Sequence, residues 1–215
     1  MKRALIVTGG SLETEFCLQY TDRYRFDYKI AVDSGMHFFY ETGKKPDLMI
    51  GDFDSACEEE LFFFEHQEGI AWIRLNPHKD DTDTEAAVRW AISNGYEEIH
   101  VLGGTGSRLD HTMGNIGLLG IGLKEGVRIL MVDPYNRIRM IKDPCSILKE
   151  EQYGKYVSLI PVTGKVTGIT LTGMKYPLTD YTMKAYGSIG ISNEIVDTEG
   201  KICFTDGVLL VFETK

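Results

Sequence analysis

The 215-residue sequence has few cysteines, no long apolar run and no excess of basic residues, and each shortage excludes a class of protein. Its four cysteines are far apart and form no Cys-x-x-Cys pair, which argues against a zinc knot or a disulfide framework. No apolar run approaches the ~18 residues that a membrane-spanning helix needs. The short apolar run 4–7 leads to Gly9-Gly10, so we expect a first strand and its turn rather than a signal peptide. We therefore expect a cytoplasmic protein that does not bind membranes.

The charge balance is acidic, with 23 Lys and Arg against 32 Asp and Glu and a formal net charge of -9. Nucleic-acid backbones are bound by clustered Lys and Arg, and the sequence has no such cluster, so we expect no nucleic-acid partner. An acidic protein can still bind a polyphosphate when metal ions supply the positive charge. The length allows one large domain or two small ones.

Two patterns divide the chain. From Lys2 to Ile141, short aliphatic runs alternate with helical patterns, which predicts crossover units: a three-layer α/β domain over residues 1–145 with a mostly parallel, Rossmann-like sheet. Expected strands are 4–8, 28–32, 48–50, 71–75, 99–102 and 128–132, and expected helices are 13–20, 36–41, 58–68, 83–94 and 112–124.

After Pro144 the runs are short, strand-like and separated by Gly, Pro and Asp, with no segment of helical length. This pattern predicts a small all-β domain over residues 146–215. Asp206-Gly207 stands between two such runs and predicts a hairpin. Expected strands are 157–161, 165–172, 189–192, 202–205 and 208–213.

The segment Lys79-Asp80-Asp81-Thr82-Asp83-Thr84-Glu85 places several carboxylates at the start of a predicted helix. Thr82 and Glu85 have the spacing of a capping box, so Asp83 falls in the first turn, where free N–H groups favour an ionised carboxylate. Neighbouring carboxylates repel one another by ~1 kcal/mol per pair in water and about 4 kcal/mol in a partly buried cleft. The cluster therefore favours a bound cation.

Other polar residues also follow predicted strands. Asp33 follows one strand, Asp52 and Asp54 follow the next, and Arg108, Asp110 and His111 follow another. The carboxyl ends of parallel strands lie along one edge of a sheet, where such folds bind ligands, so these side chains are expected to converge with the acidic segment.

Gly51-Asp52-Phe53-Asp54-Ser55 offers two carboxylates that could approach one ion. Ser55 and Glu58 suggest a second capping box. The alternative is a solvated turn in which Asp54 only starts a helix. Oxygen ligands without nearby Cys or His clusters favour Mg²⁺ over Zn²⁺.

The stretch 103–111 is rich in glycine, follows a predicted strand and opens a helix, so its backbone N–H groups could cradle phosphate. It matches neither a Walker A loop nor Gly-x-Gly-x-x-Gly. Arg108 could grip phosphate oxygens. His111 alone is more typical of a structural hydrogen-bonder, Asp110 could cap the helix, and Asn115 could face either cleft or core.

A set of motifs runs in order along nearly the whole chain. They are Ala31-Val32-Asp33-Ser34-Gly35, Pro46-Asp47, the segments 51–55, 79–83 and 106–111, Asn115, 157–161, Tyr176-Pro177-Leu178 and Ser192-Asn193-Glu194. This ordered set resembles the thiamine pyrophosphokinase family. The resemblance implies a C-terminal β-sandwich, a homodimer with active sites between subunits, and Mg²⁺-dependent transfer of pyrophosphate from ATP to the hydroxyl of thiamine, releasing AMP.

Carried over by position, the resemblance implies roles for individual residues. It assigns metal binding to Asp52, Asp54 and Asp83, and catalysis to Asp54, Asp83 and Arg108. The ATP side comprises Asp33, Ser34, Lys79, Asp80, Thr82, Arg108, Asp110, His111 and Asn115. Ser192 and Asn193 are assigned to the thiamine side, although from the residues alone a turn is the simpler interpretation of this segment.

The resulting hypothesis is that the acidic residues hold Mg²⁺ on ATP while Arg108 neutralises charge on the transferred group. Asp83 or Asp80 would accept the proton of the attacking hydroxyl. The alternatives are a pyrophosphokinase for another heterocyclic alcohol, a metal-dependent phosphohydrolase, and a non-catalytic nucleotide or thiamine sensor.

Overall fold

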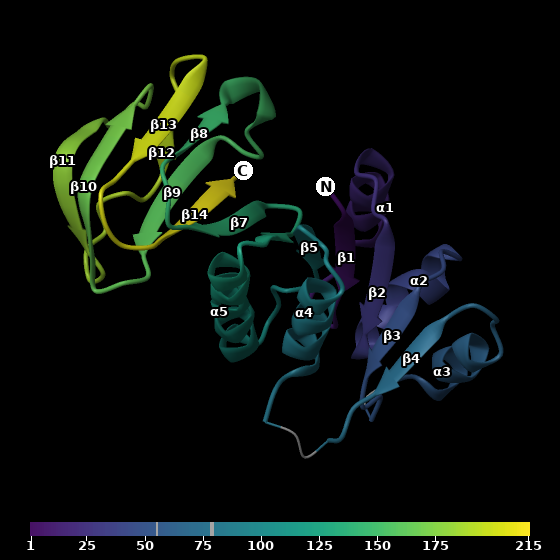
Figure 1. Cartoon of the computed structure of the whole chain (residues 1–215). Helices are drawn as coiled ribbons and strands as arrows, with labels where there is room; N and C mark the ends of the chain where they lie inside the picture. Colours follow the sequence, from purple (N-terminus) through teal and green to yellow (C-terminus); the bar gives the residue numbers. More distant parts are fainter. Residues whose placement is uncertain (55, 78–79) are drawn as a thin grey trace. The chain divides into compact units, whose positions relative to one another are not determined.

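The computed structural model describes residues 1–54, 56–77 and 80–215 (Figure 1). They form two compact units, Met1–Pro134 and Tyr135–Lys215. Ser55, His78 and Lys79 lie outside the described residues, and so do the expected roles of Lys79 and of the Ser55 cap.

The first unit is a parallel sheet with the strand order β6-β5-β1-β2-β3-β4. Strand β1 lies at the centre, and the chain builds outward from it first in one direction and then in the other. The strands are β1 (Arg3–Val7), β2 (Tyr28–Val32), β3 (Leu48–Gly51), β4 (Ala71–Arg74), β5 (Glu98–Leu102) and β6 (Arg128–Val132). The helices are α1 (Thr14–Arg23), α2 (Met36–Thr42), α3 (Glu58–Glu65), α4 (Asp83–Ser93) and α5 (Leu109–Glu125).

Helices cover both faces of this sheet. Helix α2 packs on β2 and beside α1 and α3, whereas α4 packs on β1, β2 and β3 and beside α5 (Figure 1). Right-handed crossovers require this division, because the chain reverses its direction across the sheet between β4 and β5. Every residue of β5 is buried, as is typical of a strand covered on both sides. The three-layer, mostly parallel fold predicted from the alternation is confirmed.

The second unit is a sandwich of two antiparallel sheets, with strand orders β12-β9-β14-β7 and β11-β10-β13-β8. Its core lies between them: Val157, Leu159 and Val211 of one sheet pack with Ile169 and Ile202 of the other. The strands are β7 (Asn136–Ile141), β8 (Cys145–Leu148), β9 (Tyr156–Pro161), β10 (Lys165–Thr172), β11 (Leu178–Lys184), β12 (Asn193–Glu194), β13 (Glu199–Cys203) and β14 (Leu209–Thr214).

Some expectations for the second unit are wrong. Asp206-Gly207 does not close a hairpin, since β13 and β14 belong to different sheets and Asp206 bridges to Thr167 instead. Residues 189–192 form a turn, and the strands β8 and β11 were not anticipated. By compactness the second unit begins at Tyr135, because β7 pairs with β14 along its whole length; the functional division after residue 145 stays a prediction.

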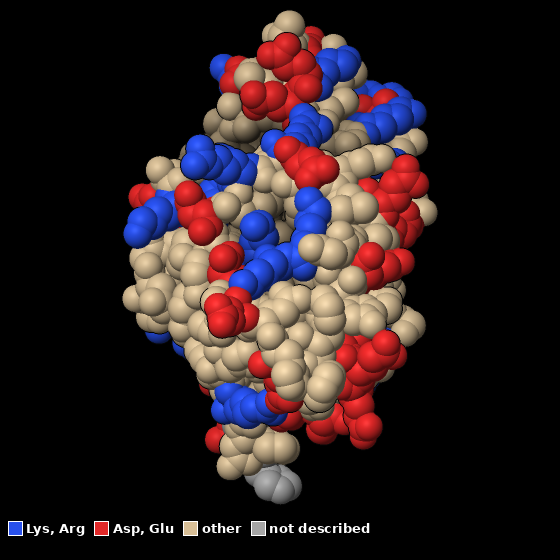
Figure 2. Space-filling model, turned by 90° about the vertical axis from the view of Figure 1, so that its right-hand side faces the viewer, with Lys and Arg blue, Asp and Glu red and all other residues tan. Residues whose placement is uncertain are grey.

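On the face in Figure 2, Lys and Arg side chains gather near the middle, whereas Asp and Glu side chains predominate toward the lower right-hand edge. Within the ranges that the structure describes, no helix is both long and apolar enough to cross a lipid bilayer.

Candidate active site

A cleft of about 470 Å³ opens in the first unit at the carboxyl ends of the parallel strands. Two of its walls are the loops after β1 and β5, the neighbouring strands at which the chain reverses direction, and open α/β sheets bind ligands at this point. The lining residues are 8–11, 33, 34, 82–84, 103–108, 111, 112 and 115.

Three carboxylates meet at this edge of the sheet. One oxygen each from Asp33, Asp52 and Asp83 lies within 4.8 Å of the others. Asp33 follows β2, Asp52 follows β3, and Asp83 is in the first turn of α4. All three are partly buried, so their mutual repulsion is stronger than it would be in bulk water.

The cluster favours a bound proton or a cation near neutral pH. Burial, the hydrogen bond and charge of the neighbouring Asp83 carboxylate and the charge of Asp52 together raise the pKa of Asp33 to about 7. The backbone N–H of Phe53, which donates to Asp33 Oδ1 at 3.4 Å, acts in the opposite direction. Three hard oxygen donors fit Mg²⁺, which would replace the shared proton as the neutralising charge.

The backbone around the cluster is strained. Asp33 has φ 46° and Phe53 has φ 61°, both in the left-handed region that costs a non-glycine residue roughly 1–2 kcal/mol. Glycine at position 51 leaves space for the Asp33 side chain, because a β-carbon there would overlap the Asp33 carboxylate. Strain of this kind persists where the surrounding packing enforces it, as at binding sites.

The start of α4 is fixed by two hydroxyl contacts. Thr82 is the N-cap, as its spacing from Glu85 predicted, and its Oγ1 accepts the Glu85 N–H at 3.2 Å. The buried Thr84 Oγ1 lies 2.9 Å from Thr8 Oγ1, which joins the first turn of α4 to the end of β1. These contacts set the position of Asp83 between them.

Replacing Thr84 with valine should lower the free energy of unfolding by about 1–3 kcal/mol, because the buried Thr8 hydroxyl loses its partner. Urea denaturation followed by circular dichroism measures this change. Thr84→Ser keeps the hydroxyl and serves as the control. A Thr84→Val variant that is as stable as the wild type would show that the hydroxyl pair does not stabilise the fold.

The two glycine-containing loops of the cleft lie backbone against backbone. Gly10 N–H donates to Gly103 O at 3.0 Å, and Ser11 N–H donates to Thr105 O at 2.7 Å. A β-carbon on Gly10 would overlap both carbonyl oxygens, so the position requires glycine. Sequence reasoning singled out the second loop as a phosphate cradle and treated Gly9-Gly10 only as a turn. The signal for the first loop was available, since it too follows the carboxyl end of a strand.

The charged residues that we expect near phosphate lie at the start of α5. Arg108 is the N-cap residue, and its Nη2 donates to Asp110 Oδ2 at 2.7 Å, with both side chains exposed. This guanidinium holds the pKa of Asp110 at about 2. Arg108 and His111 line the cleft, as do Ser34 and Asn115. Asn115 Nδ2 donates to Gly104 O at 2.8 Å, so the amide supports the loop from the cleft side.

Other expected site residues stand apart from the carboxylate cluster. Asp54 is exposed in the turn after Asp52, and its N–H donates to Asp52 Oδ1 at 3.2 Å. Asp33 takes the place in the cluster that was expected of Asp54, because β2 and β3 are neighbours and their ends meet. Asp80 is exposed and does not line the cleft.

In the second unit, the side-chain amide of Asn193 forms hydrogen bonds with backbone groups. Asn193 is buried, and its Oδ1 accepts the N–H groups of Tyr176 and Glu194, each at 2.9 Å, while its Nδ2 donates to Tyr176 O at 2.8 Å. Ser192 is exposed, has φ 56°, and donates its N–H to Ser158 Oγ at 2.9 Å. Asn193 therefore holds the Tyr176 segment, and Ser192 is the more accessible of the two.

Known proteins match both units. Residues 23–131 match the family model described as "Thiamin pyrophosphokinase, catalytic domain", and residues 145–209 match "Thiamin pyrophosphokinase, vitamin B1 binding domain". The thiamine pyrophosphokinase of Bacillus subtilis is 33% identical over 215 residues, covering 100% of this chain and 99% of that protein. The chain belongs to the thiamine pyrophosphokinase family.

Solved structures of this family have the same fold. The crystal structure of the Bacillus subtilis thiamine pyrophosphokinase superposes with a TM-score of 0.90 at 32% identity, covering 100% of this chain and 99% of that one. The thiamin pyrophosphokinase of Geobacillus thermodenitrificans gives 0.85 at 30% identity, with coverage of 99% and 97%. The carboxylate cluster and the cleft both lie in the unit that matches the catalytic domain of the family.

Proposed function

We propose that this family member is a Mg²⁺-dependent thiamine pyrophosphokinase that transfers pyrophosphate from ATP to the hydroxyl of thiamine. The observation that carries the proposal is the cluster of Asp33, Asp52 and Asp83, two of which, Asp33 and Asp83, line a cleft walled by glycine loops. The cleft volume lies in the range of small-molecule sites. Family membership and the full-length relatives support thiamine as the acceptor.

In this proposal Mg²⁺ is held by Asp33, Asp52 and Asp83. When bound there, Mg²⁺ would neutralise phosphate oxygens and polarise the reacting phosphorus. Asp54 is exposed beside Asp52, which leaves it available to incoming substrate as a further catalytic residue. Asp80 lies outside the cleft lining, which favours Asp83 over Asp80 as the group that accepts the hydroxyl proton.

The glycine loops and Arg108 would bind the phosphates of ATP. Backbone N–H groups at the start of α5 suit phosphate, and Ser34, Thr82, His111 and Asn115 surround the same cavity. An oxygen–phosphorus bond forms between the thiamine hydroxyl and the β-phosphorus as the bond from that phosphorus to the bridging oxygen of AMP breaks. Arg108 offsets the charge that develops on the transferred group, once its guanidinium exchanges Asp110 for phosphate oxygens.

We assign thiamine recognition to residues 146–215, with Ser192 as a contact and Asn193 as the support for the neighbouring segment. Residues 1–145 are assigned to ATP and Mg²⁺. We further propose a cytoplasmic homodimer, as the family resemblance implies; a molecular mass of one chain in analytical ultracentrifugation would contradict it.

Product analysis tests the activity. The protein is incubated with ATP, Mg²⁺ and thiamine, and the products are resolved by anion-exchange chromatography. AMP together with thiamine diphosphate is expected. Orthophosphate released without acceptor would indicate a phosphohydrolase, turnover only with another heterocyclic alcohol would change the substrate, and no turnover would indicate a sensor.

A further inference from the structure

The loop that carries Asp52 contains a residue in an unfavourable conformation. Phe53 has φ 61°, and for a bulky side chain the left-handed region lowers the equilibrium population by a factor of about ten. The residue is nevertheless only 6% exposed, although the next residue, Asp54, is exposed. Contacts of the ring must therefore stabilise the turn.

Two residues of the edge strand β4 provide these contacts. The Trp72 ring lies edge-on to the Phe53 ring at 5.4 Å between centroids. The Arg74 guanidinium carbon lies 5.5 Å from the centroid of each of these two rings, and Arg74 also pairs with Glu65 of α3. Arg74 is the register partner of Gly51, so it stands next to the start of the Asp52 loop.

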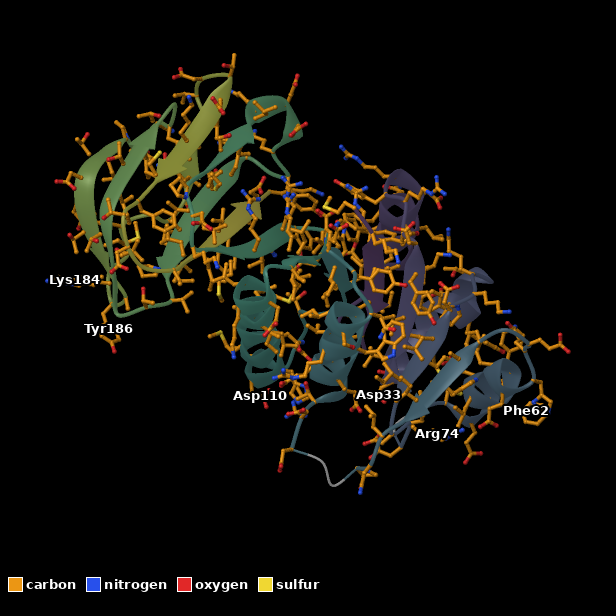
Figure 3. The ribbon with its side chains drawn as sticks, in the orientation of Figure 1. Asp33, Phe62, Arg74, Asp110, Lys184 and Tyr186 are labelled. Atoms are coloured by element: carbon orange, nitrogen blue, oxygen red, sulfur yellow. The ribbon has the colours of Figure 1, made fainter. Side chains whose placement is uncertain are left out.

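The ring contacts and the carboxylates are linked through the backbone of Phe53. Its N–H donates to Asp33 Oδ1 at 3.4 Å, and the residue before it supplies the Asp52 carboxylate. Arg74 and Asp33 lie at the same end of the sheet (Figure 3). A turn held by Trp72 and Arg74 therefore fixes two of the three carboxylates relative to each other.

We propose that Trp72 and Arg74 are positioning residues for the magnesium site: by packing against Phe53 they hold the Asp52 loop in the conformation that brings its carboxylate to Asp33 and Asp83. The identity of the ion rests on the proposed function. Neither residue lines the cleft, and no sequence motif marks either of them, because their role depends on the strained turn and on the pairing between β3 and β4.

Metal binding without nucleotide tests this role. Mn²⁺ serves as the probe, and its free and bound fractions are measured by electron paramagnetic resonance on the full-length protein. Arg74→Met and Trp72→Leu are each expected to raise the Mn²⁺ dissociation constant about tenfold. Trp72→Phe keeps an aromatic ring and should stay near the wild-type value. Circular dichroism verifies that each variant is folded.

Arg89→Met is the matched control. The Arg89 side chain is 55% exposed and pairs with Glu85, whereas that of Arg74 is 54% exposed and pairs with Glu65. The control should bind Mn²⁺ like the wild type. In steady-state assays of Arg74→Met, the KM for Mg²⁺ should rise by the same factor while kcat at saturating Mg²⁺ changes less than about twofold.

Unchanged Mn²⁺ binding by Arg74→Met and Trp72→Leu would overturn the proposal, whatever their activity. A raised KM for ATP with unchanged Mn²⁺ binding would also overturn it, since Arg74 would then contact the nucleotide directly. If the wild type forms no thiamine diphosphate but Arg74→Met still weakens Mn²⁺ binding, the proposed function fails and the positioning role stands.

Discussion

Replacing Asp83 with asparagine is expected to lower kcat by about 10²–10³-fold while the protein stays folded. The change keeps the shape of the side chain in the first turn of α4 but removes one negative charge from the carboxylate cluster. In the proposed mechanism, the metal would lose a charged ligand and the acceptor hydroxyl would lose its base. Steady-state assays with thiamine, ATP and saturating Mg²⁺ measure the effect.

Asp81→Asn is the matched control for this variant. Asp81 lies two residues before Asp83, is exposed, and does not line the cleft, so its removal should leave kcat close to the wild-type value. A near-normal kcat in Asp83→Asn would remove this residue from the mechanism. An equal loss in both variants would indicate a general effect of acidic charge near the cleft.

Replacing Glu213 with alanine is expected to lower the free energy of unfolding of the second unit by about 3–5 kcal/mol. Glu213 is fully buried on β14 and pairs with Arg137, at 2.6 Å, and with Arg139, and it also accepts the Tyr153 N–H at 3.0 Å. The substitution leaves two largely buried guanidinium groups without their counter-charge. Urea denaturation measures the loss, and Glu199→Ala, at a more exposed ion pair on β13, should change stability little.

The same carboxylate predicts an acid sensitivity. Burial alone would raise the pKa of Glu213, but the two arginines and the Tyr153 N–H lower it below its usual value. A lowered pKa means that the unfolded chain binds the proton more readily. The stabilisation is therefore present above the ordinary glutamate pKa of about 4.3 and is lost as the pH falls below it. The wild type should lose stability more steeply in acid than Glu213→Gln, and parallel pH profiles would contradict this assignment.

Much of the first unit could be predicted because its strands are buried on both faces. Runs such as 28–32 and 128–132 contain the continuous apolar segments 30–32 and 129–132 between helical patterns, and the structure has strands at these positions. The second unit was harder to predict. Strand β11 carries Thr179, Asp180 and Thr182 and has little apolar alternation, so no periodic signal identified it. A turn dipeptide such as Asp206-Gly207 specifies a local bend, but it does not determine which sheet the next strand joins.

The candidate site could be predicted where it depends on the ends of strands. Placing Asp33, Asp52 and Asp83 at one edge followed from the parallel sheet, and the cap at Thr82 followed from its spacing to Glu85. Asp33 rather than Asp54 joins the cluster because β2 and β3 are neighbours and because the chain makes a left-handed turn at Phe53. Spacing along the chain contains neither kind of information.

The hydrogen bonds between the loops at Gly10 and Gly103 affect the free energy of ligand binding. Main-chain hydrogen bonds already tie both segments to each other, so an incoming polyphosphate would meet amide groups in place rather than segments that must first be ordered. Binding to such a preorganised wall loses less conformational entropy, and more of the contact energy remains as affinity. Lengthening either segment by one residue would separate this pair and weaken nucleotide capture even with every charged side chain retained.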